Sequence, residues 1–166
     1  MKNISATFKG VITGLLMVVA ALCLFYVVKL PVTGKTQFIL IAIYLCGIMW
    51  SLFSFHKFSN NTPEERKFKQ YFSEGFRTFI VVTLIMVVFT YIFYKLNPQI
   101  LEGVIKENNE LIVKGGNKMP AEIADNEKKL RDIFIPGMLM WSIVEYLFLG
   151  ALVTLIGAGF LSQKKN

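Results

Sequence analysis

The chain has 166 residues and a formal net charge of +7, with 54% hydrophobic and only 17% charged residues. The length suits one soluble domain, but the apolar residues occur in long unbroken blocks, which excludes an ordinary soluble fold. Basic residues flank these blocks, so attraction to anionic lipid head groups explains the positive charge better than binding of nucleic acid. We therefore expect the lipid bilayer as a partner and no nucleic acid.

Four blocks are long enough to cross a bilayer, since about 20 residues at about 1.5 Å rise span its hydrocarbon core. Lipid offers no partner to unpaired backbone groups, so the blocks are predicted as helices. Runs such as FIVVTLIMVVF lack the alternation of a membrane barrel. The prediction is an all-α integral membrane protein, one domain over residues 1–166, with spans at about 11–28, 37–55, 76–94 and 136–161.

The first block is too long for the apolar core of a signal peptide, so it is predicted to be an uncleaved span. Gly10 and Gly14 stand at its start, four residues apart. Small residues at this spacing allow two helix backbones to approach closely. We expect this pair to pack against another helix of the bundle.

The connection between the second and third spans has the pattern of a basic amphipathic helix in the membrane interface. Thr62 is predicted to cap this helix, and a stripe of aromatic residues continues into the third span. Basic side chains lie beside the stripe, where anionic lipid head groups would meet them. The predicted lipid-interface residues are Arg66, Lys67, Lys69 and Arg77.

The long connection over residues 97–134 is predicted to form an extracytoplasmic helical hairpin. Asn97-Pro98 is typical of a helix start, and Gly115-Gly116 of a helix stop. A second helix is expected to begin near Pro120, and Ile135-Pro136 to mark the start of the fourth span, because proline disfavours helix in the residue before it. The apolar faces of the hairpin could pack on each other, lie on the bilayer or meet a partner.

Basic residues decide the predicted orientation of the four spans. They tie at nine on each side when Lys9 is counted with the N-terminal tail. The second connection is short and densely basic, whereas the third spreads its charges over a long loop that constrains orientation less. We therefore expect both termini in the cytoplasm.

Glu145 is the one charged residue in the fourth apolar run. Counted from Pro136 it lies about 13 Å into the span, near the midplane. Without a basic residue at that depth, the neutral acid is favoured, and it would donate to a hydroxyl or a carbonyl. The candidate polar site consists of Glu145, Ser142, Tyr44 and Thr83. It is either a hydrogen bond that holds helices together or a site for a proton, a cation or a basic group of a partner.

A second face of the fourth span is predicted to pack inside the bundle. It consists of the small residues Gly150, Thr154, Gly157 and Ala158. The bulkier face carries Glu145.

No constellation for catalysis is visible, and we expect no enzyme activity, no cofactor and no metal. The chain has a single histidine, His56, and none of the common hydrolase, zinc or phosphate-binding motifs. His56 is predicted to be an interfacial polar residue. An enzyme acting on a lipid-linked substrate would need acids of the outer hairpin, such as Glu102 or Asp132.

The stretches FSEGFRTFIVVTLIMVVFTYIFYKLNPQ and IPGMLMWSIVEYLFLGALVTLIGAGFLSQKK resemble the four-span bacterial membrane family known as domain of unknown function 4199. The shared pattern is a Gly-Phe pair before the third span, Asn97-Pro98 after it, a proline before the last span and Lys164-Lys165 at the end. The resemblance implies a bacterial inner-membrane protein without known catalytic residues. It also suggests a membrane-bound glycosyltransferase as a partner.

The sequence therefore leaves two candidate functions. The first is a non-enzymatic accessory or scaffold subunit that binds another membrane protein or a second copy of itself. The second is a small proton- or ion-coupled transporter built around Glu145. Four spans without interrupted helices offer little material for alternating access.

Overall fold

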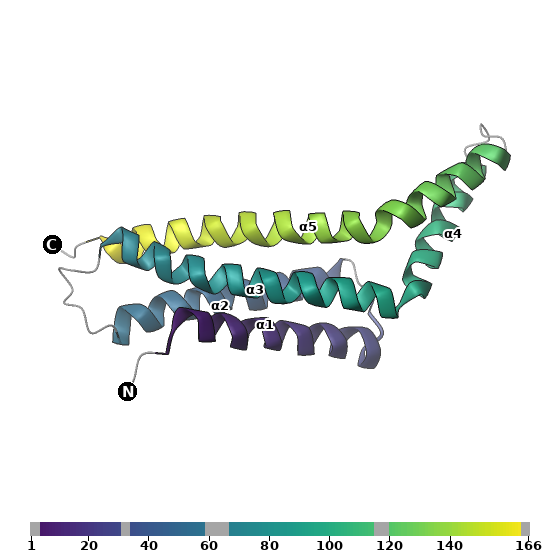
Figure 1. Ribbon diagram of the computed structural model, residues 1–166. Coiled ribbons are helices and arrows are strands. Elements are labelled where there is room, and N and C mark those ends of the chain that lie inside the picture. Colours follow the sequence, from purple (N-terminus) through teal and green to yellow (C-terminus); the bar gives the residue numbers. More distant parts are fainter. Residues whose placement is uncertain (1–3, 31–33, 59–66, 115–119, 164–166) are drawn as a thin grey trace. The chain divides into compact units, whose positions relative to one another are not determined.

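The computed structural model describes residues 4–30, 34–58, 67–114 and 120–163. Within these ranges every regular element is a helix. The elements are α1 Ala6–Leu22, the π-helix η1 Cys23–Val27, α2 Lys35–Phe58, α3 Phe68–Leu96, α4 Pro98–Lys114 and α5 Pro120–Ser162 (Figure 1). Four of the helical segments, formed by α1 with η1, α2, α3 and α5, are long and apolar enough to cross a membrane. The prediction of an all-α chain with four such helices is confirmed.

The chain forms two compact units. The first unit consists of Met1–Met86 with Val144–Asn166, and the second of Val87–Ile143. The helices α3 and α5 each continue from one unit into the other, whereas α1 and α2 belong to the first unit and α4 to the second.

The core of the first unit is built by α1, α2, the first part of α3 and the last part of α5, which lie side by side in Figure 1. Large side chains from these helices are fully or almost fully buried, among them Met17, Tyr44, Ile48, Leu52, Tyr71, Phe79, Val82 and Tyr146. Most other large apolar side chains of these helices are exposed, which is the pattern expected when lipid rather than water surrounds a bundle.

The first span ends in a π-helical turn. The amide of Val28 donates to the carbonyl of Cys23 at 3.1 Å, and the amide of Leu30 donates to the carbonyl of Leu24 at 3.0 Å. Between them Lys29 has a φ of 56°, in the left-handed region that usually takes glycine or asparagine at a helix end. This wide turn satisfies carbonyls that would otherwise be unpaired.

In the second unit, Asn97 joins α3 to α4. Its Nδ2 donates to the carbonyl of Phe93 at 2.8 Å, and its Oδ1 accepts from Gln99 Nε2 at 2.9 Å. Pro98 follows as the first residue of α4, where its missing amide hydrogen costs nothing. The predicted helix start at Asn97-Pro98 is therefore observed.

One helix replaces the two elements predicted over residues 120–161. The sequence predicts a break at Pro136, but α5 passes through this residue without interruption. A proline removes one backbone hydrogen bond, a loss that helices in membranes tolerate when other groups satisfy the freed carbonyl. The expected helix break at Pro136 is therefore not observed, whereas the start of the fourth span at this residue stays a prediction.

Two further sequence predictions fall on residues that the structure does not describe. The predicted cap Thr62 and the stop Gly115-Gly116 lie outside the described ranges. The described part of the second connection enters α3 at Phe68, eight residues before the predicted start of the third span at Phe76.

Candidate functional site

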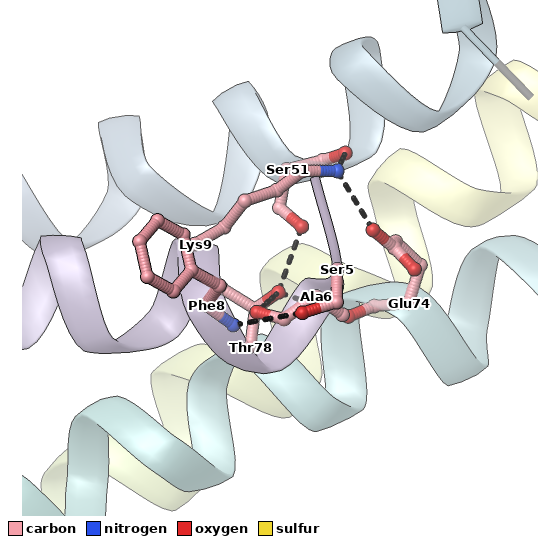
Figure 2. Close-up of polar contacts among 7 residues, drawn as sticks. All are labelled: Ser5, Ala6, Phe8, Lys9, Ser51, Glu74 and Thr78. Atoms are coloured by element: carbon pink, nitrogen blue, oxygen red, sulfur yellow. Dashed lines mark hydrogen bonds and ion pairs between the residues drawn. The ribbon is translucent and has the colours of Figure 1, made fainter. Parts of the chain in front are cut away.

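A buried ion pair connects α1 and α3 in the first unit. Lys9 Nζ lies 2.8 Å from Glu74 Oε1, and the lysine side chain is 0% exposed against 13% for the glutamate. The same ammonium donates to the backbone carbonyl of Ser51 on α2 at 3.4 Å. Figure 2 shows the lysine extended toward both acceptors. One cation on α1 thus contacts two other helices, α2 and α3.

Two hydroxyl groups complete this cluster. Ser51 Oγ and Thr78 Oγ1 are 2.7 Å apart, and both residues are fully buried. Thr78 Oγ1 is also 3.0 Å from the carbonyl of Glu74 and 3.3 Å from the carbonyl of Ala6 (Figure 2). We call Lys9, Ser51, Glu74 and Thr78 the polar cluster.

Local sequence explains how α1 approaches α3 at this point. Ser5 caps α1, because its Oγ accepts the amide hydrogen of Phe8 at 3.3 Å. One turn later, a Cβ atom at Gly10 would lie 2.8 Å from the carbonyl oxygen of Thr78. Only glycine allows this backbone contact, and it places Lys9 beside α3 rather than at the surface.

The electrostatics of the polar cluster favour a structural role. Removing a charge from water costs free energy. Pairing with an opposite charge at hydrogen-bond distance offsets this cost only when the remaining polar atoms of the pair are also hydrogen-bonded. Lys9 meets this condition with two acceptors. The arrangement can hold helices in register, and removing either charge would leave the other buried and unpaired.

His56 lies near the end of α2 and contacts α3. Its Nδ1 is 2.6 Å from Tyr71 Oη, and the two rings stack with their centroids 5.9 Å apart. Tyr71 is buried, whereas the histidine is exposed. The only histidine of the chain therefore orients a buried tyrosine at the edge of the bundle.

Glu145 bonds to an amide rather than to the predicted hydroxyls. Its Oε1 accepts from Gln37 Nε2 at 2.7 Å. Gln37 is the third residue of α2, so the carboxyl group is level with the first turn of that helix. This contact places Glu145 relative to α2 and not relative to a bilayer, so its midplane depth stays a prediction.

The three predicted partners of Glu145 each bond a backbone carbonyl. Tyr44 Oη donates to the carbonyl of Tyr146 at 2.6 Å, which joins α2 to α5. Thr83 Oγ1 donates to Phe79 at 2.8 Å and Ser142 Oγ to Met138 at 2.9 Å, each within its own helix. Within the first unit the structure thus brings Tyr44 and Thr83 into hydrogen-bond contact, whereas Glu145 bonds to Gln37.

The small-residue face of α5 lies inside the first unit. Gly150, Thr154, Gly157 and Ala158 are all buried. A Cβ atom at Gly150 would lie 2.7 Å from the Phe79 ring, and one at Gly157 would lie 2.6 Å from Leu52 Cδ1. Gly14 meets Ile85 in the same way, with 2.8 Å between the added Cβ and Ile85 Cδ1.

Among the predicted lipid-interface residues, Arg66 lies outside the described part of the chain. Lys67, Lys69 and Arg77 are exposed at the start of α3. The side chains of Phe68, Phe72 and Phe76 follow one another along this stretch with 6.0 Å between successive ring centroids. This combination of basic and aromatic groups suits a membrane interface.

An Arg131 ion-pair network links α4 and α5 in the second unit. Arg131 Nη2 on α5 donates to Glu102 Oε2 on α4 at 2.9 Å and to Glu127 Oε1 at 2.9 Å. Hydrogen bonds from the guanidinium lower the pKa of the Glu102 carboxyl from its ordinary value. Glu102 therefore holds α4 against α5 as a carboxylate.

The polar cluster was missed in the sequence. Lys9 was counted as a flanking charge of the N-terminal tail, and Glu74 precedes the third apolar block, where charges are expected. The available signal was the spacing of Glu74 and Thr78, one helical turn apart on the face that also carries Tyr71. In the ranges that the structure describes, no three His, Cys, Asp or Glu side chains are grouped so that they could hold a metal ion.

Four helices long and apolar enough to cross a membrane, with a lysine on α1 paired to a glutamate on α3, indicate a multi-pass helical membrane protein. Residues 9–163 match the model of the family described as Protein of unknown function (DUF4199), and the chain belongs to this family. No curated protein and no solved structure matches the chain. The resemblance seen in the sequence is therefore confirmed.

Proposed function

We propose that the chain is a non-enzymatic accessory or scaffold subunit of a complex in a bacterial inner membrane. Its termini lie in the cytoplasm, and α4 with the first part of α5 forms a hairpin on the opposite side. The partner is another membrane protein or a second copy of the chain.

The observation that carries this proposal is the exposure of large apolar side chains near the end of α4. Leu111 and Val113 are 63% and 66% exposed, whereas Ile105 of the same helix is 4% exposed. The helix is amphipathic and is not among the segments apolar enough to span a membrane. Exposed apolar groups on such an element are typical of an interaction surface.

The polar groups of the first unit support the same proposal. Lys9, Glu74 and Glu145 all bond to neighbouring helices. Polar side chains that bond to neighbouring helices hold the bundle together, and few of them remain to react with a substrate. A membrane bundle held together by such contacts, with a hairpin outside the membrane, suits a scaffold.

More specifically, we propose a membrane-bound glycosyltransferase as the partner. It rests on the family resemblance, which is an association and not a physical argument. A tagged chain recovered from native membranes would retain such an enzyme in a fixed ratio, and glycosyltransferase activity in the eluate would test this form directly.

The interaction surface is tested by charging it. We expect Leu111→Asp with Val113→Asp to release the partner from the full tagged chain, because a carboxylate in an apolar contact must be desolvated. Ala121→Asp is the matched control, since it adds a carboxylate at an exposed position of the same unit. Equal recovery of the partner with all three proteins would refute the role of α4.

The alternative is proton- or ion-coupled transport centred on Glu145. The observation that favours transport is a carboxyl group in the fourth apolar helix, because ionisable residues within membrane spans often mark functional sites. Its partner, however, is an amide level with the first turn of α2. Flux that is lost in Glu145→Gln vesicles would support transport, and equal proton and cation flux in both proteins would remove Glu145 from any such mechanism.

A further inference from the structure

An open apolar groove of about 400 Å³ runs between α1 and α2 in the first unit. Ile12 and Leu16 line it from α1, and Ala42, Cys46, Gly47 and Trp50 line it from α2. Ile12, Leu16 and Trp50 are 38%, 53% and 41% exposed, so the groove opens outward. The polar cluster lies inside the bundle and does not form part of it.

The floor of the groove follows from a close contact. A Cβ atom at Gly47 would collide with the side chain of Thr13, so glycine lets the two helices meet there. The hydroxyl of Thr13 donates to the carbonyl of Lys9 at 2.9 Å. It is therefore already satisfied, and the groove suits a hydrocarbon chain better than a polar ligand.

A lysine, Lys57, lies beyond one end of the groove. Lys57 stands seven residues after Trp50 on α2, so it lies on the same helix face and about 10 Å farther along the axis. It is exposed, and none of the ion pairs among the described residues involves it. Its Nζ lies over the Phe58 ring, 5.5 Å from the ring centroid. Phe53, between the two, is 53% exposed and continues the apolar surface toward the lysine.

We propose that this groove binds one acyl chain of an anionic phospholipid, whose phosphate contacts Lys57. The lining provides the apolar surface for the chain, and Trp50 lies between the chain and the cation, as amphipathic rings do at membrane interfaces. Lys57 supplies the charge that distinguishes an anionic from a zwitterionic lipid. The site is independent of the proposed scaffold role, because it involves neither α4 nor Glu145.

Trp50 provides a direct reporter of this lipid. The chain has two tryptophans, so Trp141→Phe leaves Trp50 as the single fluorophore. The full chain is reconstituted in phosphatidylcholine vesicles that contain increasing fractions of either brominated phosphatidylglycerol or brominated phosphatidylcholine. Bromine quenches tryptophan only at short range, so quenching reports an acyl chain in the groove.

We expect half-maximal quenching of Trp50 at a fraction of phosphatidylglycerol about fivefold lower than that of phosphatidylcholine, as expected for one lysine near an anionic head group. Lys57→Gln should remove this preference, and Ala42→Phe should remove it by filling the groove. Lys95→Gln, which neutralises an exposed lysine of α3, should retain it. With Trp50→Phe, the remaining Trp141 should be quenched equally by both lipids.

Two results would overturn the proposal. One is equal quenching of Trp50 by the two lipids, or a preference that persists in Lys57→Gln. The other is a groove covered by a second copy. The chain has two cysteines, so Cys23→Ser leaves Cys46, which lines the groove, as the only cysteine. Efficient disulfide crosslinking through Cys46, with Trp50 protected from both lipids, would show that occupant.

Discussion

Lys9 and Glu74 show how a charge near the end of an apolar segment can belong to the interior of a bundle. The lysine is fully buried, and its 2.8 Å contact with Glu74 joins helices that are 65 residues apart in sequence. Buried pairs of this kind are costly to break but need not be stabilising overall, since apolar residues of similar volume can replace both partners. Replacing one partner should therefore lower the free energy of unfolding more than replacing both by apolar residues.

We expect Lys9→Met or Glu74→Met alone to lower the free energy of unfolding by about 3–5 kcal/mol, because each leaves the other charge without its partner. Lys9→Met combined with Glu74→Met should recover most of this loss. Thermal unfolding of the detergent-solubilised chain measures both effects. If the double substitution is as destabilised as the sum of the single ones, the pair does not act as a unit.

Glu145 should tolerate amide chemistry. In Glu145→Gln the new side chain can still bond the amide of Gln37, so we expect stability to change by less than about 1 kcal/mol. Glu145→Leu removes the acceptor and should cost about 1–3 kcal/mol by leaving the Gln37 amide unpaired. Equal unfolding temperatures of the Gln and Leu variants would show that the 2.7 Å contact contributes nothing.

At the scale of the elements, glycine contacts set the distances between helices. Gly10 meets a backbone carbonyl of α3 and Gly47 meets Thr13 of α1. Among the residues that the structure describes, none has an atom within 4 Å of a Cβ atom added at Gly159, apart from its own chain neighbours and helix backbone. Glycines with the same local sequence pattern thus differ in what they contact. The sequence indicates small-residue faces but not which glycine touches backbone.

Gly10→Ala and Gly159→Ala form a matched pair for this difference. The first places a methyl group 2.8 Å from the Thr78 carbonyl oxygen, and overpacking of this kind should destabilise the bundle by about 1–3 kcal/mol. The second should be neutral or raise stability by up to about 1 kcal/mol through helix propensity. Similar unfolding temperatures of the two variants would contradict the observed packing of α1 on α3.

The contact between α4 and α5 should depend on pH. Arg131 lowers the pKa of Glu102 in the folded chain, so this contact contributes at neutral pH and is lost as the pH falls through that lowered pKa. Spin labels at positions 106 and 128 on a cysteine-free chain report the distance between the helices. We expect this distance distribution to broaden on acidification, and to be broad already at neutral pH in Glu102→Gln. A distribution that is the same in both proteins at every pH would contradict the role of Glu102.

The sequence was sufficient for the helices but not for their contacts. Block length and hydropathy predict four long apolar helices because lipid imposes a minimum length on each. Pro136 misled the prediction because its effect depends on surrounding groups that the sequence does not reveal. The partners of Lys9 and Glu145 were not predictable either, since hydropathy shows that a side chain lies near a span but not which helix it faces.

For the whole molecule, orientation is the first property to test. The proposed topology places the C-terminus in the cytoplasm, because the short second connection is densely basic. Alkaline phosphatase folds to an active form only outside the cytoplasm, so its fusion after Asn166 should be inactive, and a fusion within residues 115–119 should be active. The opposite pattern would invert the orientation.

The central proposal, a bundle that acts by binding a partner, is tested most directly by the mass of the native particle. The full chain is extracted from its own membrane with a mild detergent or a lipid-retaining polymer, and the mass of the intact particle is measured. We expect a mass that exceeds the 18.9 kDa of one chain by a partner in fixed ratio or by whole copies, and that falls to a single chain in Leu111→Asp with Val113→Asp. A mass of one chain with bound lipid, under every mild extraction, would contradict the proposal.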